Sequence, residues 1–253
     1  MSESLAPTEP LPANPARGLT LVQRRMLAIF EIVLCSSVPT QLALGYILTL
    51  GGWSATTPSG ALSLPYVLTL SLADTLLLIV LMVTLLHFHG ERATSLWLGE
   101  RSVRREALIG IAIIPGVFLA VVVLLNALRL LLPSLHNVPT NPLEALAGDT
   151  PGQAAMFGLL AIVAGGIREE LQRAFLLHRF EQHLGGAKVG VIVLSAAFGL
   201  GHYVQGWDAV VTTGALGAFW ALLFLDRRSS VAPVVSHAGF NSLEILRVVI
   251  GPR

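Results

Sequence analysis

The chain of 253 residues is 54% hydrophobic and only 12% charged, and its mean hydropathy is +0.73. Soluble domains carry about 25% charged residues, so this composition excludes an ordinary water-soluble protein and indicates one that resides in lipid. The net charge is +1 and no basic run is interleaved with aromatic residues, so no nucleic-acid partner is expected.

The first residues are polar and rich in proline. Residues 1–22 lack a charged segment that leads directly into a cleavable apolar one, so they predict a disordered tail rather than a signal peptide. The single cysteine, Cys35, excludes an intramolecular disulfide and a cysteine-rich zinc site. Beyond the tail we expect one membrane domain, with N-terminal helices over 23–150 and C-terminal helices over 151–253.

Apolar stretches of nearly the length that a membrane helix needs, about 20 residues, recur along the chain. They cover residues 26–50, 64–88, 107–132, 154–184, 188–203, 209–225 and 231–250, and polar loops are predicted over 51–63 and 133–153. The fourth stretch is expected to be broken at Gly165-Gly166, small residues that allow close helix approach, and to end at Gly185-Gly186 as a C-terminal cap. The expected fold is all-α: a polytopic membrane helix bundle with about seven to eight transmembrane helices and a buried polar cavity.

The basic residues predict an orientation. With seven spans, the loops that carry arginine or lysine all fall on one side of the membrane, whereas 51–63 and 133–153 carry almost none. Loops rich in arginine and lysine face the cytoplasm. We therefore expect an integral membrane protein of a bacterial inner membrane with a cytoplasmic N-terminus.

A cluster of charge interrupts the fourth apolar stretch. Arg168, Glu169, Glu170 and Arg173 lie close together, and on a helix the guanidinium of Arg173 can reach either carboxylate. Ionisable side chains within a bilayer are costly and usually face a polar cavity in which they function. A buried ion-pair knot that only fixes helix packing is the alternative. For Arg168 the predicted partner is Asp74, in the second stretch, with Glu170 or the membrane surface as alternatives.

Later apolar stretches contain two histidines and an asparagine. His202 follows Phe198 by four residues, and His237 and Asn241 share one helix face. A single membrane histidine more often only packs, but these residues together with a carboxylate pair favour a shared site. One difficulty is that straight fourth and fifth spans would place His202 nearer the outer end than Glu169, which predicts a broken helix or different span limits.

Such a set supports hydrolysis of an amide without a covalent nucleophile. A carboxylate beside a histidine can deprotonate a water molecule, while a second histidine and an amide can stabilise the oxyanion. Two histidines and a glutamate could also bind zinc, although no His-Glu-x-x-His pattern is present. No cofactor is expected, and zinc is the open alternative.

These residues resemble the CPBP intramembrane proteases, which include type II CAAX prenyl endopeptidases and bacterial Abi proteins. The family motifs are Glu-Glu-x-x-x-Arg, Phe-x-x-x-His and His-x-x-x-Asn/Asp on successive helices. The second motif corresponds here to Phe198 and His202 and the third to His237 and Asn241, within roughly residues 150–245. The resemblance implies an intramembrane endopeptidase whose substrate is a membrane-associated peptide or protein, prenylated in part of the family.

The first motif departs from the family pattern, because the distance from the glutamate pair to Arg173 is one residue short. Aligned on Arg173, the family's first glutamate falls on Arg168 and its second on Glu169; aligned on the pair, they are Glu169 and Glu170. The resemblance implies that Glu169 or Glu170 activates water with His202, while the later histidine and asparagine hold the oxyanion. Glu169 is preferred, because both alignments retain it.

Two other functions are considered. If Arg168 occupies the catalytic position, the protein is an inactive family member that serves as a membrane scaffold or binds a partner. A transporter or proton relay is suggested by the scattered Glu31, Asp74 and Arg129, but no internal repeat supports it.

Overall fold

The computed structural model describes residues 18–147 and 150–250, which form helices and connecting loops. The α-helices are α1 (Leu21–Leu34), α2 (Val38–Leu50), α3 (Leu64–Phe88), α4 (Ala93–Trp97), α5 (Val103–Leu131), α6 (Pro151–Leu160), α7 (Glu169–His183), α8 (Ala187–Leu200), α9 (Trp207–Arg227) and α10 (Val231–Ile250). Three short 3-10 helices, η2 (Pro133–Leu135), η3 (Glu144–Ala147) and η5 (Tyr203–Gln205), and the π-helix η4 (Ala161–Arg168) complete the described elements. The predicted all-α bundle is confirmed.

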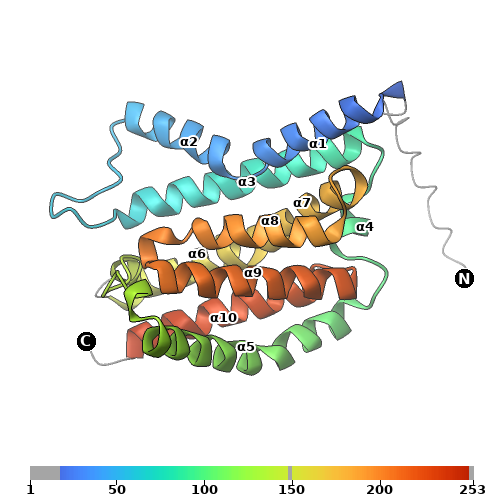
Figure 1. Cartoon of the computed structure of the whole chain (residues 1–253). Coiled ribbons are helices and arrows are strands. Elements are labelled where there is room, and N and C mark those ends of the chain that lie inside the picture. Colours follow the sequence, from blue (N-terminus) through green and yellow to red (C-terminus); the bar gives the residue numbers. More distant parts are fainter. Residues whose placement is uncertain (1–17, 148–149, 251–253) are drawn as a thin grey trace, which may run out of the picture.

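The longer helices run back and forth along one direction (Figure 1). When α1 with α2 and α6 with α7 are each taken as one rod and the five-residue α4 is left out, the described α-helices make seven rods, which match the seven apolar stretches. The rod of α6, η4 and α7 lies inside the bundle, because η4 packs against both α3 and α10. This places the charged cluster, at the junction of η4 and α7, in the protein interior.

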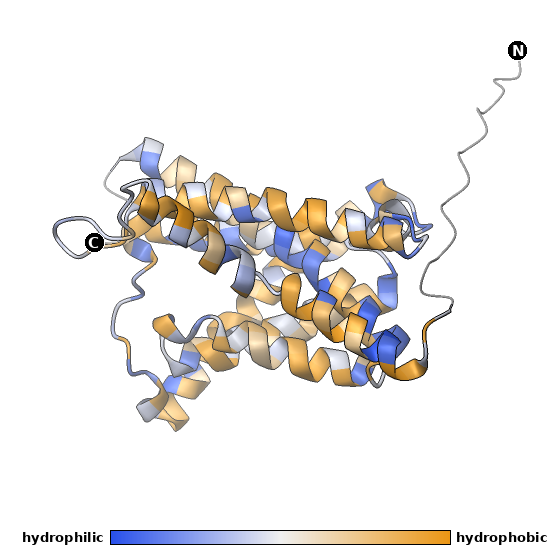
Figure 2. Ribbon diagram, turned by 90° about the horizontal axis from the view of Figure 1, so that it is seen from above, coloured by the Kyte–Doolittle hydropathy of each residue, from blue (hydrophilic) through white to orange (hydrophobic). Residues whose placement is uncertain are grey.

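Fewer helices than the predicted seven to eight meet the length and hydropathy of a membrane span. Within the described ranges these are α3, α5 and α9, and the pair α1–α2, bent by 41°, could make a fourth. The apolar helix α8 is short at 14 residues, and the rod of α6 and α7 carries charge along its second half. Hydrophobic residues nevertheless cover most of the helices, as Figure 2 shows, which is the surface that lipid requires.

The first predicted span, 26–50, is broken in its middle. Ser37 has a φ of 70°, in the left-handed region, and Pro39 follows in the first turn of α2, where its missing N–H costs no helical hydrogen bond. The break exposes backbone and hydroxyl groups at membrane depth. Gln172 on α7 supplies hydrogen bonds to these groups: its Nε2 donates to the Cys35 carbonyl at 2.5 Å and to Ser37 Oγ at 3.1 Å.

The fourth predicted stretch, 154–184, is not interrupted at Gly165-Gly166 as expected. The chain instead passes through the π-helix η4 into α7 without a break. A Cβ on Gly166 would lie 2.6 Å from Ala238 Cβ, so the glycine permits the close approach of α10. At the other end, Gly185 and Gly186 have φ of 91° and 88° and turn the chain from α7 into α8, as predicted.

Two predicted segments end differently from expectation. Of the predicted tail over 1–22, residues 1–17 lie outside the described part, and Leu21 and Val22 already belong to α1. The predicted loop over 133–153 contains η2, η3 and the first turn of α6. That turn begins with a capping box, in which Thr150 and Gln153 satisfy each other's backbone N–H groups.

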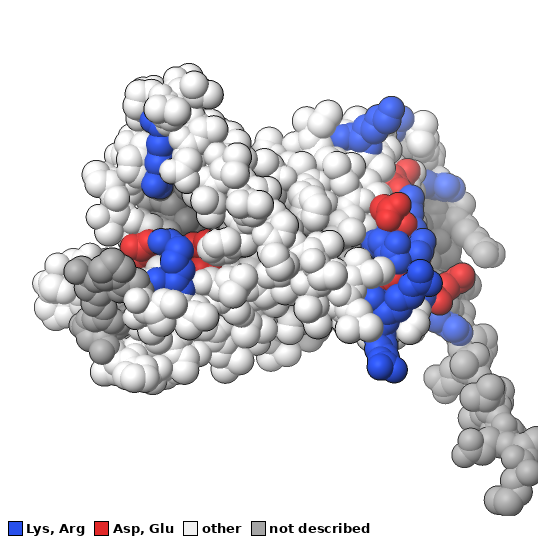
Figure 3. Space-filling view, turned by 90° about the horizontal axis from the view of Figure 1, so that it is seen from below, with Lys and Arg blue, Asp and Glu red and all other residues white. Residues whose placement is uncertain are grey.

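The charges lie mainly at one end of the bundle. Figure 3 shows most of the visible lysine and arginine side chains gathered at the end from which the N-terminal trace departs, with a smaller group at the opposite end. Near this basic end an ion pair is fully enclosed: Arg179 Nε donates to Glu31 Oε2 at 2.6 Å, and the side chains are 1% and 0% exposed. This pair ties α1 to α7.

Candidate active site

The helical hairpin of α7 and α8 brings two of the predicted site residues to the same level. Glu169 begins α7 and His202 follows the end of α8. The two residues are nearly equidistant along the chain from the turn at Gly185. The difficulty raised by straight spans is therefore removed, because the membrane crossing of the fourth stretch begins in α6 and Glu169 lies only midway along it.

Glu170 is the most enclosed member of the site, with 1% of its side chain exposed. Its Oε1 accepts hydrogen bonds from Arg173 on the same helix and from His237 Nδ1 on α10, the latter at 2.7 Å. Of the two carboxylates within the predicted reach of Arg173, the one that it binds is that of Glu170. Since the carboxylate sits between a guanidinium and an imidazole, its charge is compensated although no solvent reaches it.

His237 lies between the two carboxylates. Its Nδ1 is bound to Glu170, and its Nε2 lies 4.0 Å from Glu169 Oε2. The indole of Trp220 on α9 stacks on the imidazole, with ring centroids 3.7 Å apart and planes inclined by 16°. Trp220 also donates from Nε1 to Ser236 Oγ at 3.3 Å, so the indole that holds His237 is itself held.

Glu169 is the more accessible carboxylate, with 20% of its side chain exposed. Arg168 Nη2 donates to its Oε1 at 3.1 Å, and this leaves Oε2 directed toward His237. One carboxylate is therefore locked in place while the other retains a free oxygen beside a partly open space. Of the two, Glu169 has the exposure that a base acting on water needs.

Arg168 is bound on its other side by Asp74. Its Nη1 donates to Asp74 Oδ2 at 2.7 Å and to Ser37 Oγ at 2.9 Å. The Asp74 carboxylate, 0% exposed, also accepts from Thr40 Oγ1 at 2.5 Å and Gln41 Nε2 at 3.1 Å on α2. The predicted pairing of Arg168 with Asp74 is confirmed, and it joins α2, α3 and the end of η4 behind Glu169.

His202 contacts the rest of the site through Phe198. Its Nδ1 is 2.8 Å from the Phe198 carbonyl, which fixes Nδ1 as the donor, and the two rings lie 4.8 Å apart. The Phe198 ring in turn lies 6.2 Å from the His237 ring and 4.7 Å from the Arg173 guanidinium carbon. Among the described contacts, His202 forms no direct bond to either carboxylate, and its Nε2 is free.

Asn241 lies one turn beyond His237 on α10 and faces the π-helix. Its Nδ2 donates to the Ala161 carbonyl at 3.1 Å, and a Cβ on Gly165 would lie 2.6 Å from that nitrogen. A primary amide has two N–H groups, so one donor remains for another acceptor. The absence of a side chain on Gly165 leaves the space that this donor needs.

Some functional residues are not indicated by the motifs. Trp220 lies in an apolar stretch where an aromatic residue reads as core, and only the structure places it on His237. The role of Ser37 depends on the break between α1 and α2. Gln172, in contrast, is a polar residue inside the charged cluster, and this position could have signalled a buried partner.

A zinc site does not fit the described residues. Within residues 18–147 and 150–250, no group of three or more histidine, cysteine, aspartate or glutamate side chains is arranged to hold a metal ion. The predicted alternative of two histidines and one glutamate is not formed there, because His202 is separated from the carboxylates by Phe198. No step below is routed through a metal.

The fold and this cluster define a polytopic membrane protein with an acid–imidazole site between its helices. Residues 151–243 match the family model described as Rce1-like, type II CAAX prenyl endopeptidase. The match runs from α6 into α10 and includes every predicted site residue, and it confirms the resemblance to the CPBP family. No curated protein and no solved structure matches the chain. The apolar helices and this match together support an integral membrane protein.

Proposed function

We propose that the protein is an intramembrane endopeptidase that hydrolyses a peptide bond of a membrane-associated substrate with water activated by Glu169. The observation that supports this most is the asymmetry of the carboxylates: Glu170 is enclosed by Arg173 and His237, whereas Glu169 is 20% exposed with Oε2 4.0 Å from His237 Nε2. A partly exposed carboxylate oxygen beside an imidazole can accept a proton from water.

In the proposed reaction, Glu169 removes a proton from water while the water oxygen bonds to the scissile carbonyl carbon. The free Nε2 of His202 accepts a hydrogen bond that orients the water. The carbon–nitrogen bond then breaks as Glu169 returns its proton to the leaving nitrogen, which gives an amine and a carboxylic acid, and the acid loses its proton to solvent. No covalent bond to the protein forms at any step.

The oxyanion is proposed to be held by Asn241 Nδ2 and His237 Nε2. Since His237 Nδ1 already donates to Glu170, donation from Nε2 requires the doubly protonated ring. The hydrogen bond to Glu170 and the stacked indole of Trp220 hold the ring so that Nε2 faces Glu169. Glu170 and Trp220 are thus proposed to keep His237 oriented.

The proposal predicts the effect of single substitutions on cleavage. Purified protein in liposomes is incubated with a farnesylated CAAX peptide and with its unlipidated form, and the products are measured by mass spectrometry. Glu169→Gln, His202→Ala and His237→Gln should each lower the rate by roughly 10²–10⁴-fold, the usual contribution of acid–base groups. Thermal unfolding of each variant checks that the fold is retained.

Glu244→Gln is the matched control, because Glu244 also lies on α10 but pairs with the exposed Arg247. It should cleave at the wild-type rate. Normal cleavage by folded Glu169→Gln would remove Glu169 as the base, and equal loss in Glu244→Gln would show that the assay reports stability rather than chemistry.

A second function is favoured by one observation. Arg168 Nη2 donates to Glu169 Oε1 at 3.1 Å, so a guanidinium occupies one oxygen of the proposed base. On this basis the alternative is an inactive family member that binds a partner in the membrane. It predicts that the wild-type protein cleaves neither peptide and that Glu169→Gln retains cellular function.

A further inference from the structure

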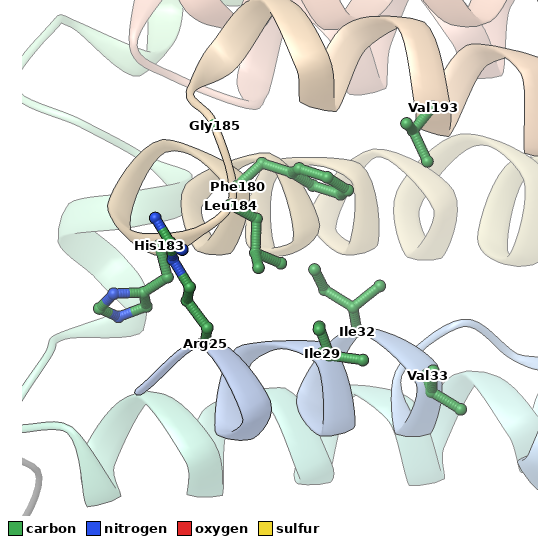
Figure 4. Close-up of a pocket in the computed structure, with 9 residues that line it drawn as sticks. All are labelled: Arg25, Ile29, Ile32, Val33, Phe180, His183, Leu184, Gly185 and Val193. Atoms are coloured by element: carbon green, nitrogen blue, oxygen red, sulfur yellow. The ribbon is translucent and has the colours of Figure 1, made fainter. Parts of the chain in front are cut away.

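A pocket away from the candidate active site opens between α1 and the turn that joins α7 to α8. Its volume is about 500 Å³, within the range of about 300–1,000 Å³ of small-molecule sites. The walls are apolar: Ile29 and Ile32 point from α1 toward Phe180 and Leu184, and Val193 closes the side formed by α8 (Figure 4). Such walls fit a hydrocarbon chain better than a polar ligand.

The mouth of the pocket carries one fixed cation, Arg25. His183 lies next to it, and no acidic side chain lines the pocket in the described part of the chain. Arg25 is exposed and forms no ion pair with any described residue. The helix α1 also has no acidic residue in its first turn, where the positive end of the helix dipole adds to the arginine charge.

The pocket lies toward the end of the bundle that carries most of the visible basic side chains (Figures 1 and 3). An arginine at the end of a membrane helix lies at the level of the lipid headgroups. A ligand that suits both parts of the pocket therefore has an anionic group at headgroup level and an apolar chain that enters between the helices.

We propose that this pocket binds one anionic phospholipid, with its phosphate on Arg25 beside His183 and one acyl chain between α1 and the α7–α8 hairpin. Arginine suits a phosphate because its guanidinium can donate two parallel hydrogen bonds. A lipid in this place would join the N-terminal helix to the hairpin that carries Glu169. The site is separate from the proposed catalytic cluster and does not depend on it.

Native mass spectrometry of the full chain tests this proposal. Protein released from detergent micelles is titrated with phosphatidylglycerol or with phosphatidylcholine of the same acyl chains, and bound lipid is counted. Phosphatidylglycerol should bind more tightly, and Arg25→Gln should weaken its binding roughly fivefold, the usual effect of one basic residue at an anionic surface. Arg92→Gln, an exposed arginine outside the pocket, should leave binding unchanged.

A second variant tests the acyl chain separately. Val193 lines the pocket and is 46% exposed, so Val193→Trp can fill the space without displacing the core. It should abolish lipid binding while thermal unfolding without lipid stays as in the wild type. Binding that survives Val193→Trp, equal binding of both lipids, or equal weakening by Arg92→Gln would overturn the proposal. Displacement by millimolar inorganic phosphate alone would assign the site to free phosphate instead and also overturn it.

Discussion

Arg168 holds two carboxylates at once, one from the candidate active site and one from outside it. Asp74 on α3 balances its charge through Nη1, and Glu169 accepts a hydrogen bond from Nη2. Arg168, which lies where the sequence departs from the family motif, is therefore paired on both sides inside the protein and does not direct its charge into lipid. It fixes the rotamer of Glu169 from behind, on the side away from His237.

Removal of the charge of Asp74 should destabilise the fold. In Asp74→Asn the buried Arg168 keeps only Glu169 as counter-charge, and breaking a buried ion pair costs about 3–5 kcal/mol. The thermal midpoint in detergent should fall by several degrees. Asp226→Asn is the control, because that side chain is 75% exposed and should change the midpoint little. Equal shifts in both variants would contradict a structural role of the buried pair.

For individual residues, the sequence predicts which buried polar side chains need a partner, and in some cases it also predicts which residue that partner is. Asp74 is the single charged residue of its apolar stretch and has few ways to avoid isolation, so its pairing with Arg168 of the charged cluster could be predicted. The stack of Trp220 on His237 could not, because an indole in an apolar helix satisfies hydrophobicity wherever it packs. The missing contact between His202 and the carboxylates depends on the Phe198 ring, whose rotamer no spacing reveals.

Among the elements, the π-helix η4 has the largest consequence for the site. It precedes Glu169 directly, so its wider turn sets the direction in which the glutamates of α7 point. Its glycines also allow α10 to approach, and α10 carries His237 and Asn241. The sequence indicated the close approach from Gly165-Gly166 but predicted a break there, since two glycines in a helix suggest an interruption.

The close packing of η4 on α10 can be tested at Gly166. Gly166→Ala places a Cβ 2.6 Å from Ala238 Cβ and 2.9 Å from its Cα, so α10 must shift. Overpacking of this kind costs about 1–3 kcal/mol. The matched change Gly158→Ala in α6 meets nothing within 4 Å and should be neutral or stabilising by up to about 1 kcal/mol. Thermal unfolding in detergent measures both, and a stable Gly166→Ala would argue against a tight η4–α10 contact.

Over the whole molecule, polarity lies inside and at the ends while apolar side chains face outward. The three residues that suggested a transporter are all engaged in ion pairs, Glu31 with Arg179, Asp74 with Arg168 and Arg129 with Asp208. Their scatter along the sequence reflects one requirement, that each buried charge have a partner. The seven apolar stretches predicted the number of rods. The bend between α1 and α2 and the joining of α6, η4 and α7 into one rod depend on side-chain packing, which hydropathy does not describe.

The distribution of basic residues predicts that the N-terminus faces the cytoplasm. Ser59 lies in the loop between α2 and α3 and Ser102 in the loop before α5, and both are exposed. In intact cells, a membrane-impermeant maleimide should label Ser59→Cys but label Ser102→Cys only after the membrane is opened. The native Cys35 is 0% exposed and should give little background. The reverse pattern would show the opposite orientation.

The order of the paired charges along the chain has a consequence for biogenesis. Glu31, Asp74 and Glu106 are synthesised well before Arg179, Arg168 and Arg227, which neutralise them. Asp74 has no arginine or lysine in its own apolar stretch, and an acid without a counter-charge is costly in hydrocarbon. These early segments can form their final ion pairs only after the later ones have been translated.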